Sequence, residues 1–225
     1  MSRQRVAVIG LGSMGYGMAV SLKRAGHDVT GCDVTADAVK RFVAEGGRGA
    51  KKPVEAARDA DIVFSVVVNA AQTEAILFGH DGVAESLPKD AVFVSSATMD
   101  PDVARRLAKQ LEATGRHYLD APISGGAQRA AQGELTILAS GSATAFAKAR
   151  PALDAMAAKL YELGDVAGQG AAFKMINQLL AGVHIAAASE AMTFAAKQGL
   201  DLRKVYDVIT GSAGNSWMFE NRMPH

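Results

Sequence analysis

Short apolar runs rich in β-branched residues alternate with helical patterns over the first 165 residues of the chain. Most runs are continuous rather than interrupted by polar residues, which is typical of strands buried on both faces of a parallel sheet. The predicted strands are 5–9, 28–32, 62–68, 91–95, 117–120, 135–139 and 160–163, and the predicted helices lie near 14–25, 35–45, 71–78, 101–113 and 143–157. This order predicts an α/β fold, with a mostly parallel sheet and helices on both of its faces.

The pattern changes after the glycine-rich segment 164–170. From there to about residue 198, alanine, leucine and methionine dominate without a proline, and Gly199 follows in the position of a C-terminal helix cap. We therefore predict one long helix near 170–198, of about 28 residues and ~42 Å, and a second helix at 202–210. We place a domain boundary at about 165, with a sheet domain over 1–165 and the start of an all-helical C-terminal domain over 166–225.

The long helix carries more apolar side chains than the short remainder of the chain can cover. Two helices are also too few to form a core of their own. We therefore expect one of two arrangements: this region packs against a partner subunit, giving a homodimer or homotetramer, or the helical domain is present only in part.

Composition and charge exclude several classes of protein. The formal net charge of +1 gives no reason to expect nucleic acid or an acidic membrane surface as a partner. We expect no targeting segment, and we expect the apolar stretch 179–196 to be a buried helix rather than a membrane span, because it contains His184 and Glu190. The single cysteine, Cys32, fits a reducing compartment, so we expect a cytoplasmic protein. The histidines share no metal-site spacing, so we expect no metal.

The first predicted strand runs directly into a glycine-rich turn, and a helical pattern follows it; the turn reads Gly10-Leu11-Gly12-Ser13-Met14-Gly15. Gly10 permits the tight turn, Gly12 lets a pyrophosphate approach the backbone, and Gly15 lets the helix pack close to the strand. The amino end of that helix would then face the phosphates. A glycine-rich turn can be merely structural, but this position at the first strand–helix junction indicates dinucleotide binding on a Rossmann-type sheet.

Asp33 ends the second predicted strand, 18 residues after Gly15. A carboxylate at this position can accept hydrogen bonds from the 2′-hydroxyl of the adenosine ribose and would repel a 2′-phosphate. We therefore favour NAD over NADP, although Arg41 is near enough in sequence to keep NADP open. A role for Asp33 in capping the following helix is the structural alternative, and both roles are compatible.

Other polar and small residues follow predicted strands at their carboxyl ends, where open α/β sheets bind ligands. Ser124, Gly125 and Gly126 could cradle a substrate carboxylate with a hydroxyl and bare N–H groups, or they could form a loop that needs glycine for backbone reasons alone. Thr98 follows the fourth strand, and Val67 and Val68 end the third, so all three would line the cofactor cleft.

Lys174, Asn177 and Gln178 occupy one face of the long predicted helix, at positions i, i+3 and i+4. Most lysines are exposed to solvent, and a solvated lysine at the helix start is the ordinary interpretation. Here the two amides on the same face, together with apolar neighbours along the chain, favour a polar pocket instead.

Four segments in this order, 10–19, 95–101, 120–126 and 168–178, together resemble the β-hydroxyacid dehydrogenase family, which includes 3-hydroxyisobutyrate dehydrogenases and tartronate semialdehyde reductases. The stretch 177–185 looks most like its L-threonate dehydrogenase branch. Many family members have asparagine at the position of Gln178, which leaves the identity of the substrate open. Family members also continue through further helices, so the resemblance implies a helical domain of which 166–225 is the first part.

The resemblance implies a role for each candidate residue. Lys174 would be the catalytic lysine. The substrate carboxylate and hydroxyls would be held by Ser124, Gly125, Gly126 and Asn177, to which we add Gln178 from the shared helix face. The cofactor would contact Gly10, Gly12, Gly15, Asp33 and Thr98, with Val67 and Val68 along its path and Leu11, Ser13 and Met14 in the same turn.

The leading hypothesis is an enzyme that transfers a hydride between NAD and a small hydroxy acid, with a sugar acid such as L-threonate as the specific expectation. Oxidation of an alcohol also removes the hydroxyl proton, and Lys174 would act as the general acid/base. A free lysine, with a pKa of about 10.4, is almost wholly protonated at neutral pH, so the site would have to favour the neutral amine. The alternatives are a tartronate semialdehyde or 3-hydroxyisobutyrate-type enzyme, and a non-catalytic dinucleotide sensor.

Overall fold

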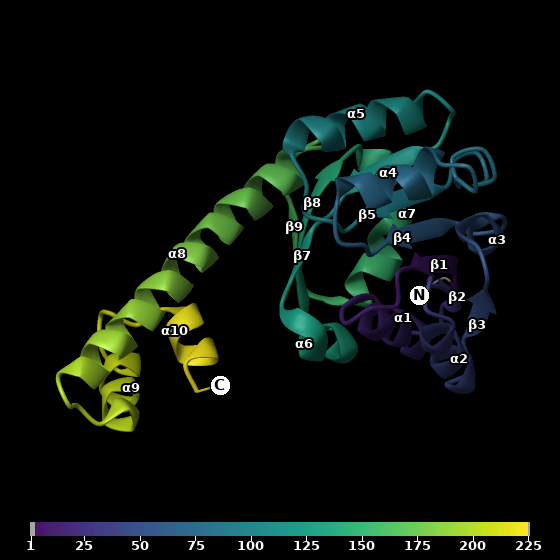
Figure 1. The fold of residues 1–225 in the computed structure, drawn as a ribbon. Coiled ribbons are helices and arrows are strands. Elements are labelled where there is room, and N and C mark those ends of the chain that lie inside the picture. The colour runs from purple at the N-terminus through teal and green to yellow at the C-terminus, as the bar shows by residue number, and fades with distance from the viewer. Residues whose placement is uncertain (1–2, 225) are drawn as a thin grey trace. The chain divides into compact units, whose positions relative to one another are not determined.

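The computed structural model describes residues 3–224 of the chain. The chain forms two compact units, Met1–Lys174 and Met175–His225, and the division between them falls inside the long helix α8 (Gln169–Lys197) (Figure 1). The first unit holds the sheet and the helices that cover it. The second unit is helical.

In the described part of the chain, nine strands form one sheet. Six strands run parallel in the order β3-β2-β1-β4-β5-β6, and β8 then pairs antiparallel with β6. Strand β7 pairs antiparallel with β8, and β9 pairs parallel with it. The bounds are β1 (Arg5–Ile9), β2 (Asp28–Cys32), β3 (Arg48–Ala50), β4 (Ile62–Ser65), β5 (Val92–Ser95), β6 (His117–Asp120), β7 (Ile123–Ser124), β8 (Leu135–Gly141) and β9 (Ala157–Glu162).

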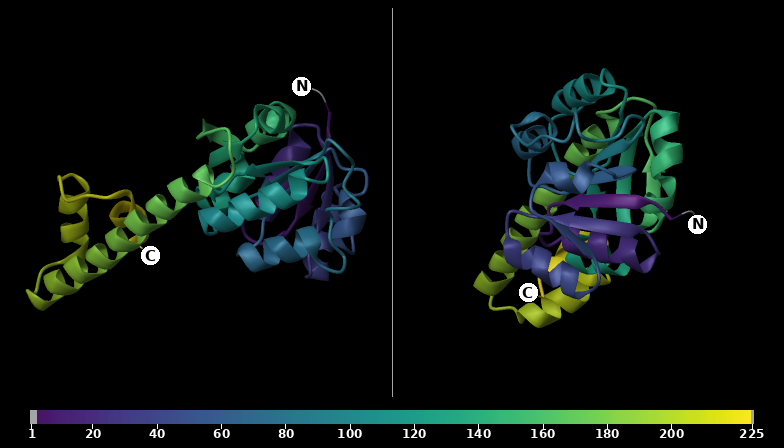
Figure 2. Two further views of the ribbon diagram at one scale, coloured as in Figure 1. Left: turned by 90° about the horizontal axis from the view of Figure 1, so that it is seen from above. Right: turned by 90° about the vertical axis from the view of Figure 1, so that its right-hand side faces the viewer.

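Two apolar cores lie on the two faces of this sheet, because successive side chains of a strand point to opposite faces. In β1, Val6 and Val8 pack into one core, whereas Ala7 and Ile9 pack into the other. Helices of the first unit cover both faces (Figure 2). Their bounds are α1 (Gly15–Arg24), α2 (Ala36–Ala44), α3 (Pro53–Ala57), α4 (Ala70–Phe78), α5 (Pro101–Glu112), α6 (Gly126–Gln132) and α7 (Ala143–Asp154).

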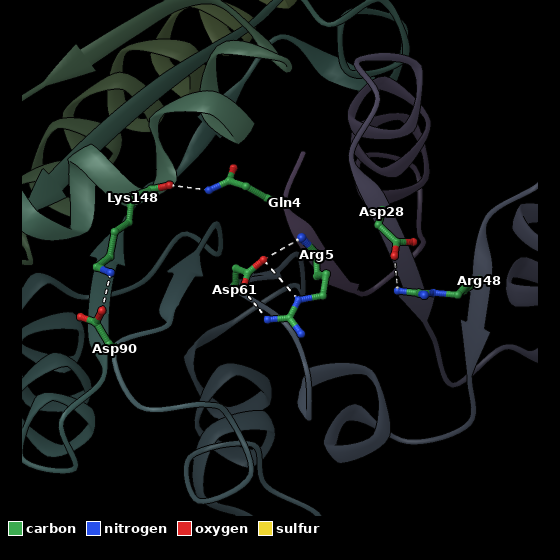
Figure 3. Close-up of polar contacts among 7 residues, drawn as sticks. All are labelled: Gln4, Arg5, Asp28, Arg48, Asp61, Asp90 and Lys148. Atoms are coloured by element: carbon green, nitrogen blue, oxygen red, sulfur yellow. Dashed lines mark hydrogen bonds and ion pairs between the residues drawn. The ribbon is translucent and has the colours of Figure 1, made fainter. Parts of the chain in front are cut away.

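The strand order reverses at β1, which pairs with β2 on one side and β4 on the other. Ligands of open α/β sheets bind outside the carboxyl ends of the strands at such a switch point. The opposite edge is occupied by surface ion pairs: Arg5 at the start of β1 lies 2.7 Å from Asp61, and Arg48 lies 2.9 Å from Asp28 at the start of β2 (Figure 3). Exposed pairs of this kind contribute at most about 1 kcal/mol each. The topology therefore predicts a ligand site at the carboxyl ends of the strands.

The α/β fold with a mostly parallel sheet is confirmed. The predicted strand 62–68 is shorter than expected, because β4 ends at Ser65 and the chain then turns toward α4, which Asn69 caps by accepting a hydrogen bond from Gln72. Strands β3 and β7 and helices α3 and α6 were not predicted. Strand β3 has the sequence Arg-Gly-Ala, which lacks the large apolar residues that would predict a strand. It forms as an edge strand through backbone pairing with β2.

The second unit contains the rest of α8, followed by α9 (Leu202–Thr210) and α10 (Trp217–Arg222). The prediction of one long helix is confirmed, but the prediction that its apolar stretch is buried is wrong within this chain. Most of its side chains beyond Lys174 are exposed, including Leu179 and Val183, since among the described residues only two short helices follow it. By length and composition alone α8 could also cross a membrane, contrary to expectation, although core helices of globular proteins meet the same criterion.

Candidate active site

The glycine turn between β1 and α1 has the geometry that the sequence predicted. Gly10 has φ +98°, and a Cβ on it would lie 2.2 Å from the carbonyl oxygen of Val66. A Cβ on Gly15 would lie 1.8 Å from the carbonyl oxygen of Gly10, so both positions exclude any side chain. A Cβ on Gly12 would meet no described atom within 4 Å, and the turn is therefore open where a pyrophosphate would approach.

Asp33 links this turn to the end of β2. Its Oδ2 accepts a hydrogen bond of 2.6 Å from the backbone N–H of Leu11, and its Oδ1 accepts one of 2.7 Å from the N–H of Thr35. The carboxylate thus stabilises the loop that leads into α2. It does not cap the helix as the structural alternative predicted, because the N-cap residue is Thr35 and no side-chain hydrogen bond caps it. Each ionised oxygen can accept a further hydrogen bond, so these contacts leave room for a ribose hydroxyl.

A pocket of about 430 Å³ lies beside Asp33 and Gly12. Arg41 lines it and stacks on Tyr16, with its guanidinium carbon 3.9 Å from the ring centre. An adenosine has a flat apolar base and a ribose that donates hydrogen bonds, and this lining offers surfaces for both. The open turn, the carboxylate and the pocket therefore fit the adenosine and pyrophosphate parts of NAD.

The loop after β6 lies close to the glycine turn because α6 packs on α1. Ser21 of α1 donates a hydrogen bond of 2.9 Å to the carbonyl oxygen of Ala130, and a Cβ on Gly17 would lie 2.6 Å from the backbone nitrogen of Ala131. Ala131 also lines the pocket that contains Gly12. Helix packing therefore holds the predicted substrate loop and the cofactor turn next to each other.

Within that loop, Ser124 is half-buried in β7 and Gly126 is the first residue of α6 rather than a free loop residue. Gly125 and Gly126 have φ +138° and +80°, values that side chains rarely allow. The backbone reason for glycine is therefore present here, and it is compatible with the predicted anion cradle.

The remaining cofactor candidates follow adjacent parallel strands, so the segments that carry them leave the same edge of the sheet. Val67 and Val68 follow β4, and Thr98 follows β5. Val68 and Thr98 are exposed, and Val67 is half-buried. Among residues 3–224, no cluster of three or more metal-ligating side chains was found.

Lys174 belongs to the first unit, near the amino end of α8. Only 7% of its surface is exposed, although its neighbours Phe173 and Met175 are each about half exposed. Burial lowers the pKa of its amine below the usual value, because the ammonium form loses hydration. The interpretation of Lys174 as a solvated lysine is therefore wrong, while the polar pocket shared with Asn177 and Gln178 stays a prediction.

Asn177 and Gln178 lie in the second unit, one turn further along α8. Both are exposed, and the Asn177 Nδ2 donates a hydrogen bond of 3.2 Å to the Gln178 Oε1. They follow Lys174 by three and four residues in the same helix, and side chains at this spacing lie on one helix face.

Sequence reasoning missed the role of Asp120, which it noted only as the start of a motif. The side chain is completely buried, and its Oδ2 accepts hydrogen bonds from the backbone N–H groups of Gly168 (3.0 Å) and Ala171 (2.8 Å). Ser140 donates a longer bond of 3.4 Å to the same oxygen. Oδ1 has no partner among the described residues. The available signal was a carboxylate at the end of an otherwise apolar strand.

The buried carboxylate makes folding stability depend on pH. Burial raises the pKa of Asp120 to about 6, so between pH ~4 and ~6 the unfolded chain loses a proton that the folded protein keeps. We expect this group to reduce the free energy of unfolding by about 3 kcal/mol as the pH rises through that window. Asp61, whose pKa Arg5 lowers, contributes the opposite slope.

Urea unfolding of the wild type and Asp120→Asn at several pH values checks this prediction, because the amide cannot titrate. The difference in stability between the two proteins should change across pH 4–6 and stay constant above it. Two curves that run parallel through the window would contradict it.

Comparisons with known proteins identify the family of the chain. The family model for the NAD binding domain of 6-phosphogluconate dehydrogenase matches residues 5–164, and the model described as NAD-binding of NADP-dependent 3-hydroxyisobutyrate dehydrogenase matches residues 168–225. The L-threonate dehydrogenase of Cupriavidus necator is 51% identical over 225 residues, which cover 100% of this chain and 75% of that protein.

Two further relatives support the same assignment. The L-threonate dehydrogenase of Haemophilus influenzae is 49% identical over 98% of this chain and 73% of its own length. The crystal structure of a 3-hydroxyisobutyrate dehydrogenase from Salmonella typhimurium has a TM-score of 0.92 and 48% identity, covering 98% of this chain and 77% of that one. The chain belongs to the β-hydroxyacid dehydrogenase family of NAD-binding oxidoreductases, and it resembles the L-threonate dehydrogenases of that family along its whole length.

Proposed function

We propose that the protein oxidises a small hydroxy acid, a sugar acid such as L-threonate, with Lys174 as the general acid/base. The observation that carries the proposal is the burial of Lys174 in a chain with an NAD-type glycine turn. The two relatives named L-threonate dehydrogenase supply the choice of substrate.

NAD, held by the glycine turn and Asp33, would supply the acceptor for the hydride that leaves the carbon of the substrate alcohol. The hydroxyl proton goes to the Lys174 amine, which must be neutral to accept it. Burial lowers the pKa of this amine in the required direction. In the reverse reaction the ammonium form donates the proton to the developing alkoxide. Oxidation should therefore accelerate as the pH rises toward the pKa of this amine.

We propose that the substrate carboxylate binds to the Ser124 hydroxyl and to the N–H groups of Gly125 and Gly126. Glycine residues present their N–H groups without side-chain obstruction, which suits an anion. Asn177 and Gln178 would hydrogen-bond the substrate hydroxyls. An amide that is exposed in this chain can serve this purpose because it both donates and accepts hydrogen bonds.

We assign cofactor binding to the turn, to Asp33 and to the strand ends described above. The full proposed set is Gly10, Leu11, Gly12, Ser13, Met14, Gly15, Asp33, Val67, Val68 and Thr98. NAD is the proposed partner of Asp33 because a carboxylate repels a 2′-phosphate. We also propose 1–165 as the nucleotide-binding domain and 166–225 as the opening of a helical domain, in a cytoplasmic homodimer or homotetramer.

A substrate panel tests the proposal. The purified protein is given NAD and a series of C3 and C4 hydroxy acids, and the absorbance of the reduced nicotinamide is followed. L-Threonate should give the highest kcat/KM, above 3-hydroxyisobutyrate and above D-threonate as the stereochemical control. A preference for 3-hydroxyisobutyrate, or for glycerate, whose oxidation gives tartronate semialdehyde, would favour the second candidate activity; the Salmonella typhimurium relative is named for the first of these two acids. NAD binding without turnover of any acid would overturn both.

A further inference from the structure

We propose that Asp120 and Ser140 position Lys174 by holding the amino end of α8 against the sheet. We call this pair the Asp120–Ser140 clamp. The inference rests on the proposed function only in that it takes Lys174 to be the acid/base group; the clamp itself is a feature of the fold.

The two clamp residues are neighbours in the sheet. Asp120 ends β6 and pairs in register with Ser140 of β8, and both side chains are completely buried. Together they accept three backbone hydrogen bonds from the start of α8, two from its first turn and one from Gly168 directly before it. Asp120 accepts from Gly168 and Ala171, and Ser140 accepts one of 2.9 Å from Gly170. Three of the otherwise unpaired N–H groups of this helix end are thereby satisfied, by a carboxylate and a hydroxyl from a distant part of the chain.

The helix start lies directly on the strand ends. A Cβ on Gly170 would lie 2.4 Å from the carbonyl oxygen of Leu138 and 2.9 Å from that of Asp120. No side chain, and no water layer, fits between them. The position of the first turn is therefore fixed by the sheet and not only by the loop that leads to it.

Lys174 follows Ala171 by three residues, which is about 4.5 Å along the helix axis. Its burial depends on the path of the preceding turn, because its neighbours Phe173 and Met175 are already half exposed. A small rotation or local unwinding of that turn would bring the amine into water. Its pKa would then rise toward the ordinary value, and less of the neutral base would be present at a given pH.

The inference is tested by measuring how accessible position 174 is, in the absence of NAD and substrate. Lys174→Cys is introduced together with Cys32→Ala, so that one thiol remains, and its reaction with a small maleimide is followed. We expect slow reaction in this background and reaction at least about tenfold faster after Asp120→Ala, because two buried N–H groups then lose their acceptor and the first turn opens more readily. Asp120→Asn retains an acceptor oxygen and should restore protection to within about threefold.

Three matched variants complete the test. Phe173→Cys places a thiol at the adjacent exposed position, where the clamp substitutions should not change the rate. Asp201→Ala removes a capping carboxylate from α9, where it accepts hydrogen bonds from Arg203 and Lys204, and should leave position 174 protected. Ser140→Ala should give an intermediate increase in rate, and it carries the test if Asp120→Ala does not fold.

Activity supplies a second reading with the lysine in place. Asp120→Ala should lower kcat about tenfold or more with an unchanged Kd for NAD, and Asp120→Asn should recover most of the loss. The clamp is refuted if the thiol at 174 stays equally protected after Asp120→Ala or Ser140→Ala, whatever the activity. Should Lys174→Met keep its turnover, the proposed function fails while the accessibility result stands, so the two failures are distinguishable.

Discussion

Replacing Lys174 by methionine should lower kcat by a factor of about 10²–10⁴, the usual contribution of a positioned acid/base group. Methionine has a similar length and no titratable group, so the loss reports the amine rather than the packing. The Kd for NAD should not change, because the residues proposed to bind the cofactor lie in the turn and at the strand ends. Steady-state kinetics together with NAD titration checks both parts of this expectation.

Stability gives an independent reading of the same variant. Taking a lysine whose pKa is lowered by burial out of the protein removes an unfavourable ammonium, so Lys174→Met should unfold at an equal or higher temperature than the wild type. Lys197→Met is the matched control, since that lysine is exposed in the last turn of the same helix and should leave kcat unchanged. Near-native turnover in Lys174→Met would remove the acid/base assignment.

Replacing Asp33 by alanine should shift the ratio of kcat/KM with NAD to that with NADP by roughly 100-fold toward NADP. Hydrogen bonds to a charged group are worth about 1.5–3 kcal/mol, and loss of the negative charge also removes its repulsion of the 2′-phosphate. Arg41 lines the same pocket, so its positive charge would then favour binding of the 2′-phosphate. The measurement is a pair of saturation curves for the two cofactors.

Two controls separate the charge of Asp33 from its hydrogen bonds. Asp33→Asn removes the charge and keeps one acceptor oxygen, which can serve Leu11 or Thr35 but not both, so most of the shift in preference should remain. Asp37→Ala removes a nearby exposed carboxylate that pairs with Lys40, and the ratio should be unchanged. An unaltered ratio in both Asp33 variants would mean that this residue only supports the loop.

Much of the fold could be predicted because its strands are continuous apolar runs and its first turn demands glycine. Strands β1, β2 and β6 begin and end where the sequence placed them. Strand β3 could not be predicted, because it is an exposed edge strand of three residues stabilised by backbone pairing, which does not require apolar side chains. Helix α6 begins at a pair of glycines, which local propensity assigns to a loop.

The candidate site was predictable to a different extent at each residue. The burial of Lys174 was inferred from its neighbours on one helix, which is a local property. The hydrogen bonding of Asp120 was not, because its partners directly before and in the first turn of α8 lie 48 and 51 residues further along the chain, and only the folded sheet brings them together. Asp33 is an intermediate case. Ribose binding and capping of α2 were predicted as compatible roles, whereas the structure shows hydrogen bonds to the glycine turn and to the loop before α2.

The packing of α6 on α1 has a consequence for how this protein tolerates mutation. Each helix begins at one of the two loops proposed to bind ligands, and the helices touch through Gly17 and the backbone of Ala131. A larger residue at Gly17 would displace both loops at once, although it touches neither the proposed substrate cradle nor the catalytic lysine. We therefore expect substitutions at this contact between α1 and α6 to change the Michaelis constants for coenzyme and hydroxy acid in parallel. A mutation there could not change one affinity during evolution without changing the other.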